Sequence, residues 1–198
     1  MPKKSAAAAY PQVKIATRAA LRAWLRENHA RSKGAWLLLR KRSAGGSVAW
    51  NDIVEEVLCF GWIDSLPRKV DDEHTSLLVT PRKPKSKWSA KNKRHVAELE
   101  AKGLLHAAGR AVIARSKEDG TWDALDQVSA LVVPPDLAKA FSEYPGSRAH
   151  WEGFPPSARR GILEWIDGAR RSETREKRIL ETAREAALGR RANQWPRG

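Results

Sequence analysis

Residues able to bind a ligand concentrate between Trp62 and Asn92. The fifteen residues of segment 81–95 contain seven Lys or Arg and no acidic residue, in a chain whose net charge is +14. The same segment supplies a hydroxyl at Ser89 and an aromatic ring at Trp88. Because arginine, lysine and hydroxyl donors recognise phosphates and carboxylates, the segment predicts a site for an anion.

The predicted site combines a stacking face, two cations, two hydrogen-bonding side chains and one carboxylate. The aromatic rings would stack on the ligand, the cations would neutralise its charge, and the hydroxyl and amide would fix its orientation. The carboxylate would hold an arginine in place or act as a base. The predicted ligand-binding residues are Trp62, Asp64, Arg82, Lys83, Trp88, Ser89 and Asn92.

Catalysis is left open, and Asp64 and Glu56 are the candidates for an acid or base if there is any. Structural roles compete with each functional interpretation. Trp62 has the pattern of a core residue, Asp64 that of an ion pair or turn cap, and Ser89 that of a helix cap. The lysines of the segment also fit a solvated helix face.

Metal and cofactor chemistry find no support in the sequence motifs. The histidines at 29, 74, 95, 106 and 150 do not form a His-Glu-x-x-His pattern, and a single cysteine, Cys59, has no second thiol to share a metal with. Neither a phosphate-binding P-loop nor a Gly-x-Ser-x-Gly motif occurs. The sequence therefore predicts no metal and no cofactor.

The secondary structure expected around the site is a hairpin followed by a helix. Strands over 62–70 and 75–80 flank a turn-prone acidic stretch, and Ser89 is placed to cap a helix that runs to about Lys102. A helix begins after Thr17 and ends near Asn28, a strand covers 35–40, and a further helix covers about 53–60. The positive end of the helix after Ser89 would then lie in the cationic segment.

The second half of the chain reads as almost wholly helical. Helices are expected over 109–117, 135–143, 156–169 and 172–188, and Pro135 and Pro156 occupy first-turn positions where a missing N–H is tolerated. We predict an α+β fold with a small, mainly antiparallel sheet covered by helices and an all-helical C-terminal extension. The expected divisions are a disordered tail over 1–15, an α+β ligand-binding domain over 16–133, a helical module over 134–190 and a disordered tail over 191–198.

The composition indicates in which cellular compartment the protein is expected. One cysteine rules out an intramolecular disulfide and fits the reducing cytoplasm. No window of eighteen apolar residues is present, so no membrane span is expected. The sequence does not determine the oligomeric state.

Several motifs resemble a known family. Segments 55–64, 80–84 and 86–92, together with the helical tail from about Pro134 that contains Ser172-Glu173-Thr174-Arg175, are similar to the YdeI/OmpD-associated family, also labelled bacteriocin-protection or OmdA proteins. The resemblance implies a helical OmdA-like module over 134–190. It also implies a role in stress or in resistance to bacteriocins and antimicrobial peptides.

Three classes of function remain open. The first is a pocket protein that binds a small phosphorylated or carboxylated ligand at the junction of hairpin and helix. The second is a nucleic-acid binder without sequence specificity, which would use the basic surface and weaken steeply as salt rises. The third is a stress or resistance adaptor recognised through the helical tail.

Overall fold

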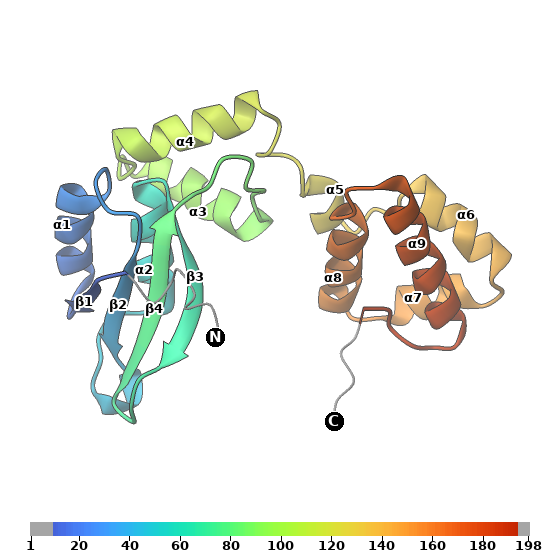
Figure 1. Cartoon of the computed structure of the whole chain (residues 1–198), viewed down its shortest axis with the longest axis horizontal. Helices are drawn as coiled ribbons and strands as arrows, with labels where there is room; N and C mark the ends of the chain where they lie inside the picture. The colour runs from blue at the N-terminus through green and yellow to red at the C-terminus, as the bar shows by residue number, and fades with distance from the viewer. Residues whose placement is uncertain (1–9, 194–198) are drawn as a thin grey trace, which may run out of the picture. The chain divides into compact units, whose positions relative to one another are not determined.

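The chain folds as two compact units, Met1–Asp123 (unit 1) and Ala124–Gly198 (unit 2). The computed structural model describes residues 10–193 (Figure 1). The expected tails lie partly outside this range, since 1–9 and 194–198 are not among the described residues.

A four-stranded sheet forms the centre of unit 1, in the order β1-β2-β4-β3. Strands β2 (Ala35–Arg40) and β3 (Trp62–Lys69) each pair antiparallel with β4 (His74–Pro81), whereas β1 (Gln12–Ile15) pairs parallel with β2. The predicted hairpin, the mainly antiparallel sheet and the α+β class are therefore confirmed. Strand β1 occupies positions that the sequence had placed in the N-terminal tail.

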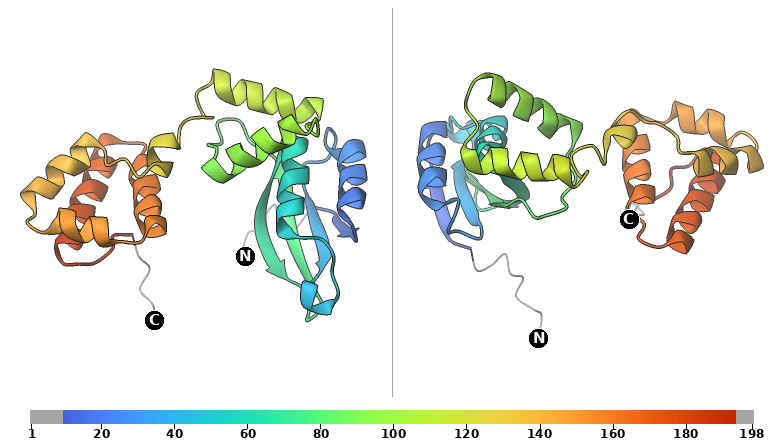
Figure 2. Two further views of the ribbon diagram at one scale, coloured as in Figure 1. Left: turned by 180° about the vertical axis from the view of Figure 1, so that it is seen from behind. Right: turned by 90° about the horizontal axis from the view of Figure 1, so that it is seen from above.

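One face of the sheet packs against α2 (Trp50–Cys59), which lies in front of the strands in the view from behind (Figure 2, left). Alternate residues of the central strands enter this core, including Leu37 and Leu39 of β2 and Leu77 and Val79 of β4. On the opposite face Trp36 pairs across the strands with Leu78, and the Arg68 guanidinium lies 4.2 Å from the Trp36 ring. This alternation follows from the two-residue period of a strand.

Three further helices complete unit 1: α1 (Arg18–Asn28), α3 (Ala90–Ala101) and α4 (Ala107–Glu118). The side chains of Thr17 and Ser89 accept hydrogen bonds from the first turns of α1 and α3, which confirms both predicted N-caps. A short 3₁₀ turn, η2 (Arg42–Ala44), follows β2.

Helix α4 approaches the end of α2 backbone to backbone at Gly109. A Cβ atom added there would lie 2.3 Å from the carbonyl oxygen of Cys59, far inside van der Waals contact. Cys59 itself is fully buried, and burial raises the pKa of its thiol above the usual range. Glycine at this position is therefore a packing requirement of unit 1.

Unit 2 is helical throughout its regular structure: α5 (Asp126–Ser129), α6 (Pro135–Glu143), α7 (Ser147–Gly153), α8 (Pro156–Asp167) and α9 (Ser172–Ala187). Pro135 and Pro156 stand in the first turns of α6 and α8, as predicted. The short helices α5 and α7 were not expected from the sequence. The core of unit 2 gathers apolar residues from all of these helices: Val128, Leu137, Phe141, Trp151, Ile162, Ile166, Ile179 and Ala183.

Across residues 10–193, none of the helices combines the length and apolar character that crossing a lipid bilayer requires.

Candidate functional site

The predicted site residues come from β3, from the end of β4, from the loop over 82–88 (the basic loop) and from the start of α3. The backbone joins these parts, because the N–H of Arg82 donates to the carbonyl oxygen of Gly61, just before β3, over 3.0 Å. Trp62, the first residue of β3, is 1% exposed and donates its indole N–H to the carbonyl oxygen of His29. Trp62 is therefore a core residue whose ring offers no open face.

Arg82 and Trp88 form the centre of the basic loop. The Arg82 guanidinium lies 3.7 Å from the centroid of the Trp88 ring, and its Nη2 donates to the carbonyl oxygen of Lys87 over 2.5 Å. Trp88 is 1% exposed and also packs against Trp122, with ring centroids 4.8 Å apart. The ring of Trp88 therefore serves as a platform for a cation inside the protein.

No acidic side chain accompanies Arg82 within the described part of the chain. Arg82 is only 5% exposed, and its buried Nε and Nη1 atoms have no hydrogen-bond partner among residues 10–193. Burial lowers the pKa of this guanidinium to about 10, because a low-polarity environment disfavours the charged form. Arg82 is thus a buried cation with spare donors.

The rest of the loop is exposed and basic. Lys83 and Lys87 lie at the surface, and Lys85 adopts a φ of 61°, a left-handed conformation that is uncommon for a residue with a side chain. Ser89 caps α3 by accepting from the N–H of Asn92 over 3.2 Å. Lys83, Ser89 and the partly exposed Asn92 therefore border the loop at the positive end of a helix.

The two candidate acids lie apart from this loop. Asp64 is half-buried on β3 opposite Val79, and the Arg82 guanidinium makes no hydrogen bond to it, since Nη2 donates to Lys87 and neither Nε nor Nη1 has a partner among residues 10–193. Glu56 is 2% exposed on α2 and accepts from Arg18 over 2.7 Å and from Arg22 over 2.8 Å. These pairs favour a structural role for Glu56.

Two cavities of unit 1 lie outside the predicted junction. One, of about 480 Å³, lies beside β1 and β2 and is lined by residues that include Lys14, Arg40 and His74. Another, of about 460 Å³, is lined by Arg18, Arg22, Glu55, Glu56, Lys102 and Leu104. The second cavity places the arginines of α1 beside two carboxylates of α2.

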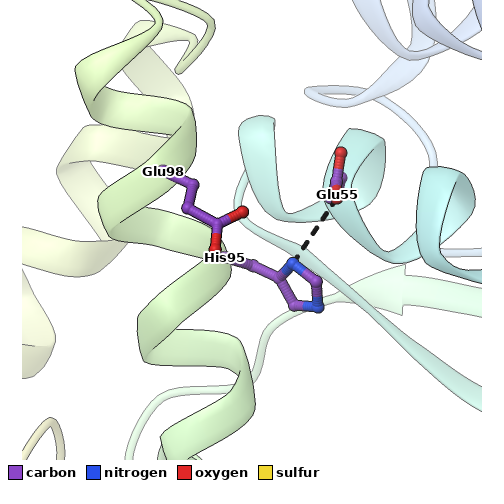
Figure 3. A group of neighbouring side chains, drawn as sticks. All are labelled: Glu55, His95 and Glu98. Carbon is purple, nitrogen blue, oxygen red and sulfur yellow. Dashed lines mark ion pairs between the residues drawn. The ribbon is translucent and has the colours of Figure 1, made fainter.

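The sequence analysis did not predict one group of neighbouring side chains that could bind a metal ion. Glu55 of α2 meets His95 and Glu98 of α3, and one ligand atom from each lies within 4.8 Å of the others (Figure 3). The spacing of His95 and Glu98, three residues apart on a helix, was a visible signal that they share a face. Nothing in the sequence places Glu55 beside them, because that contact depends on how α2 packs against α3.

Comparison with protein families gives two matches. Residues 13–112, half of the chain, match the family described as Domain of unknown function (DUF8412). Residues 130–189 match the family described as Bacteriocin-protection, YdeI or OmpD-Associated (OmdA). No match was found among curated proteins or among solved structures.

The boundary of the OmdA match refines the resemblance stated from sequence. The motifs over 55–64 and 80–92 lie within the DUF8412 match, and the helical segment from Pro134 lies within the OmdA match. The C-terminal match to the YdeI/OmpD-associated (OmdA) family supports the resemblance stated from sequence. Because the other match spans half of its length, the chain belongs to the DUF8412 family.

Proposed function

We propose that unit 1 binds a small anionic ligand, phosphorylated or carboxylated, at the basic loop and the start of α3. The observation that carries the proposal is Arg82, a buried guanidinium without an acidic partner among residues 10–193. Burying an unpaired charge is costly, since water no longer solvates it. An anion bound beside Arg82 would remove that cost, so ligand binding accounts for a feature that is otherwise destabilising.

The surroundings of Arg82 favour an anion. The side chains of Lys83, Lys85 and Lys87 are exposed around it, and the amino-terminal turn of α3 adds the positive end of a helix dipole. Stacking on Trp88 fixes the plane of the guanidinium, which suits two-point contact with a phosphate or carboxylate. The exposed lysines and the helix dipole would therefore attract an anion, and the Arg82 guanidinium would bind it in a fixed orientation.

Ligand binding at Arg82 requires the loop to move. Nε and Nη1 are both shielded from solvent, so an anion reaches them only when residues 83–88 shift. The left-handed backbone of Lys85 places a costly conformation in this segment, which lowers the energy needed to rearrange it. We expect the environment of the Trp88 ring to change when the ligand binds.

The test is a thermal-shift and calorimetric screen of the full chain at physiological salt. The probes are inorganic phosphate, pyrophosphate, ATP, citrate, and a twelve-nucleotide single-stranded DNA. A small anion present at 100 times its Kd should stabilise the wild type by about 2.7 kcal/mol. Arg82→Met, which keeps the bulk of the side chain and removes the charge, should abolish this stabilisation.

The matched control is Arg94→Met, which removes the same charge from an exposed position on α3. The proposal requires that small-anion binding survive in Arg94→Met and disappear in Arg82→Met. Stabilisation by DNA alone, fading with added salt and weakened equally by both variants, would instead establish the nucleic-acid alternative.

The family match of unit 2 supplies the biological setting that we propose. Because the name of that family includes bacteriocin protection, we place the anion site in a cytoplasmic protein that contributes to stress or to bacteriocin and antimicrobial-peptide resistance. A strain lacking the protein should become more sensitive to such peptides, and the wild-type chain should restore resistance. Complementation of this strain with Arg82→Met tests whether resistance depends on the anion site. Cell fractionation tests whether the protein is cytoplasmic.

A further inference from the structure

We propose that Glu55, His95 and Glu98 form a binding site for a divalent transition metal, of which Zn²⁺ is the best fit. The site lies between α2 and α3 and does not include the residues of the basic loop. It is therefore a second site of unit 1, independent of the anion site proposed above.

The geometry of the three side chains matches what one ion needs. His95 and Glu98 lie one helical turn apart on α3, and both approach Glu55 of α2 (Figure 3). His95 Nδ1 and Glu55 Oε1 are 3.5 Å apart, and two ligand atoms of a tetrahedral zinc with bonds near 2.1 Å are separated by about 3.4 Å. Glu98 is exposed, so its side chain can rotate to bring its carboxylate, within 4.8 Å of the other ligand atoms, to bonding distance.

The imidazole of His95 supplies a separate observation. Its side chain is only 12% exposed, and both ring nitrogens are shielded from solvent without a hydrogen-bond partner among residues 10–193. The 3.5 Å separation from Glu55 Oε1 is longer than a normal N–H···O hydrogen bond. Buried polar atoms without partners are rare, and an ion absent from the structure is one of their recognised explanations.

Arg18 holds Glu55 in the orientation that the site requires. Its Nη1 lies 2.8 Å from Glu55 Oε2, which leaves Oε1 directed toward His95. Partners that orient a ligand carboxylate in this way are typical of metal sites. Glu55 also lines the cavity of about 460 Å³ beside α1, so the site has a route to solvent.

The ligand set selects the class of metal. One imidazole and two carboxylates suit Zn²⁺ and neighbouring transition metals, whereas Mg²⁺ prefers oxygen ligands and retains several waters. Two carboxylates also balance the charge of a divalent ion. Three protein ligands leave the fourth tetrahedral position for a water molecule, as in catalytic zinc sites, where the metal lowers the pKa of that water.

The test is calorimetric titration of the full chain, purified without a histidine tag and treated with a chelator. We expect one Zn²⁺ per chain and no measurable binding of Mg²⁺. Glu98→Gln and His95→Gln should each weaken Zn²⁺ binding by about tenfold or more, since loss of an orienting partner alone has that effect in known sites. Glu98→Gln changes an exposed residue, so it tests the site in a protein that folds normally.

Matched controls separate this site from adventitious binding. His74→Gln removes a histidine paired with Asp71 at 3.0 Å, and Glu100→Gln removes an exposed carboxylate of α3; both should bind Zn²⁺ as the wild type does. Arg82→Met should also retain Zn²⁺ binding, whether or not it binds anions. Absence of Zn²⁺ binding, or binding unaffected by Glu98→Gln and His95→Gln, would overturn the proposal.

Discussion

Glu56 and Arg82 are both charged side chains buried in unit 1, at 2% and 5% exposure, but their surroundings differ. Glu56 receives hydrogen bonds from Arg18 and Arg22, so its negative charge is neutralised within the fold. Among residues 10–193, the partners of the Arg82 guanidinium are only the carbonyl oxygen of Lys87, to which it donates, and the face of the Trp88 ring. Glu56 is therefore a buried charge that serves stability, whereas Arg82 is a buried charge that residues 10–193 leave uncompensated, which is why we propose ligand binding at Arg82.

The largest effect should come from removing Glu56. Glu56→Ala leaves Arg18 and Arg22 close together without the carboxylate that joins them, and breaking a buried ion pair typically costs 3–5 kcal/mol. Because both arginines are partly exposed, we expect a loss of about 3 kcal/mol in the free energy of unfolding. Urea unfolding of the full chain, followed by circular dichroism, measures it.

The control for this change is Glu100→Ala, an exposed position on α3 where the effect should stay within about 0.5 kcal/mol. Equal stability of Glu56→Ala and Glu100→Ala would mean that the ion pairs of Glu56 contribute nothing.

Removing Arg82 should have the opposite sign. In the ligand-free protein, Arg82→Met replaces an unpaired buried charge with an apolar side chain of similar length, so the free energy of unfolding should rise by about 1 kcal/mol. A destabilised Arg82→Met protein, measured by the same urea experiment, would show that the cation is a structural element rather than a ligand anchor.

The pH dependence of that difference sharpens the comparison. Arg82 has a pKa of about 10 in the folded protein, below its ordinary value, so the unfolded chain holds the proton more tightly. Stability of the wild type relative to Arg82→Met should therefore rise as the pH increases through 10. Below pH 10 the penalty for the buried charge is fully present, and the difference between the two proteins should be constant.

The smallest effect concerns His106, which lies near Arg22, one of the two arginines bonded to Glu56. Burial, the neighbouring His29 and nearby arginines lower the pKa of His106, because all of them disfavour a second positive charge there. The unfolded chain then binds the proton at higher pH than the folded protein, so stability should fall as the pH drops below the usual histidine range. Thermal unfolding of wild type and His106→Asn between pH 7.5 and 5.5 measures this slope, which should be shallower in the variant.

An equal slope in the two proteins would show that folding does not lower the pKa of His106.

Local signals predicted the elements of this protein well. The caps at Thr17 and Ser89, the prolines that open α6 and α8 and the turn between β3 and β4 act within a few residues, so they can be read directly from the sequence. The fold class follows from the order of these elements. Strand β1 was missed because it is short and is defined by its parallel pairing with β2, more than twenty residues away.

The site was harder to predict because its properties depend on long-range packing. Trp88 is surrounded by basic residues in the sequence, but Trp122 and Arg82 enclose it in the fold. The side-chain patterns placed Arg82 among the predicted ligand-binding residues, but they could not reveal that it would be buried or that Asp64 would stay apart from it. The meeting of Glu55 with His95 likewise depends on two helices that the sequence separates by thirty residues.

The close approach at Gly109 bears on how sequence variation among related proteins should be interpreted. A methyl group at that position would collide with the backbone of α2, so substitutions there would be rejected in any protein that keeps this crossing of α2 and α4, whatever it binds. If the glycine at this position is invariant among related proteins, its invariance reflects the packing of α4 on α2 and carries no information about a ligand. Variation at Arg82, whose guanidinium has no acidic partner among residues 10–193, would instead mark lineages in which the proposed ligand has changed or been lost.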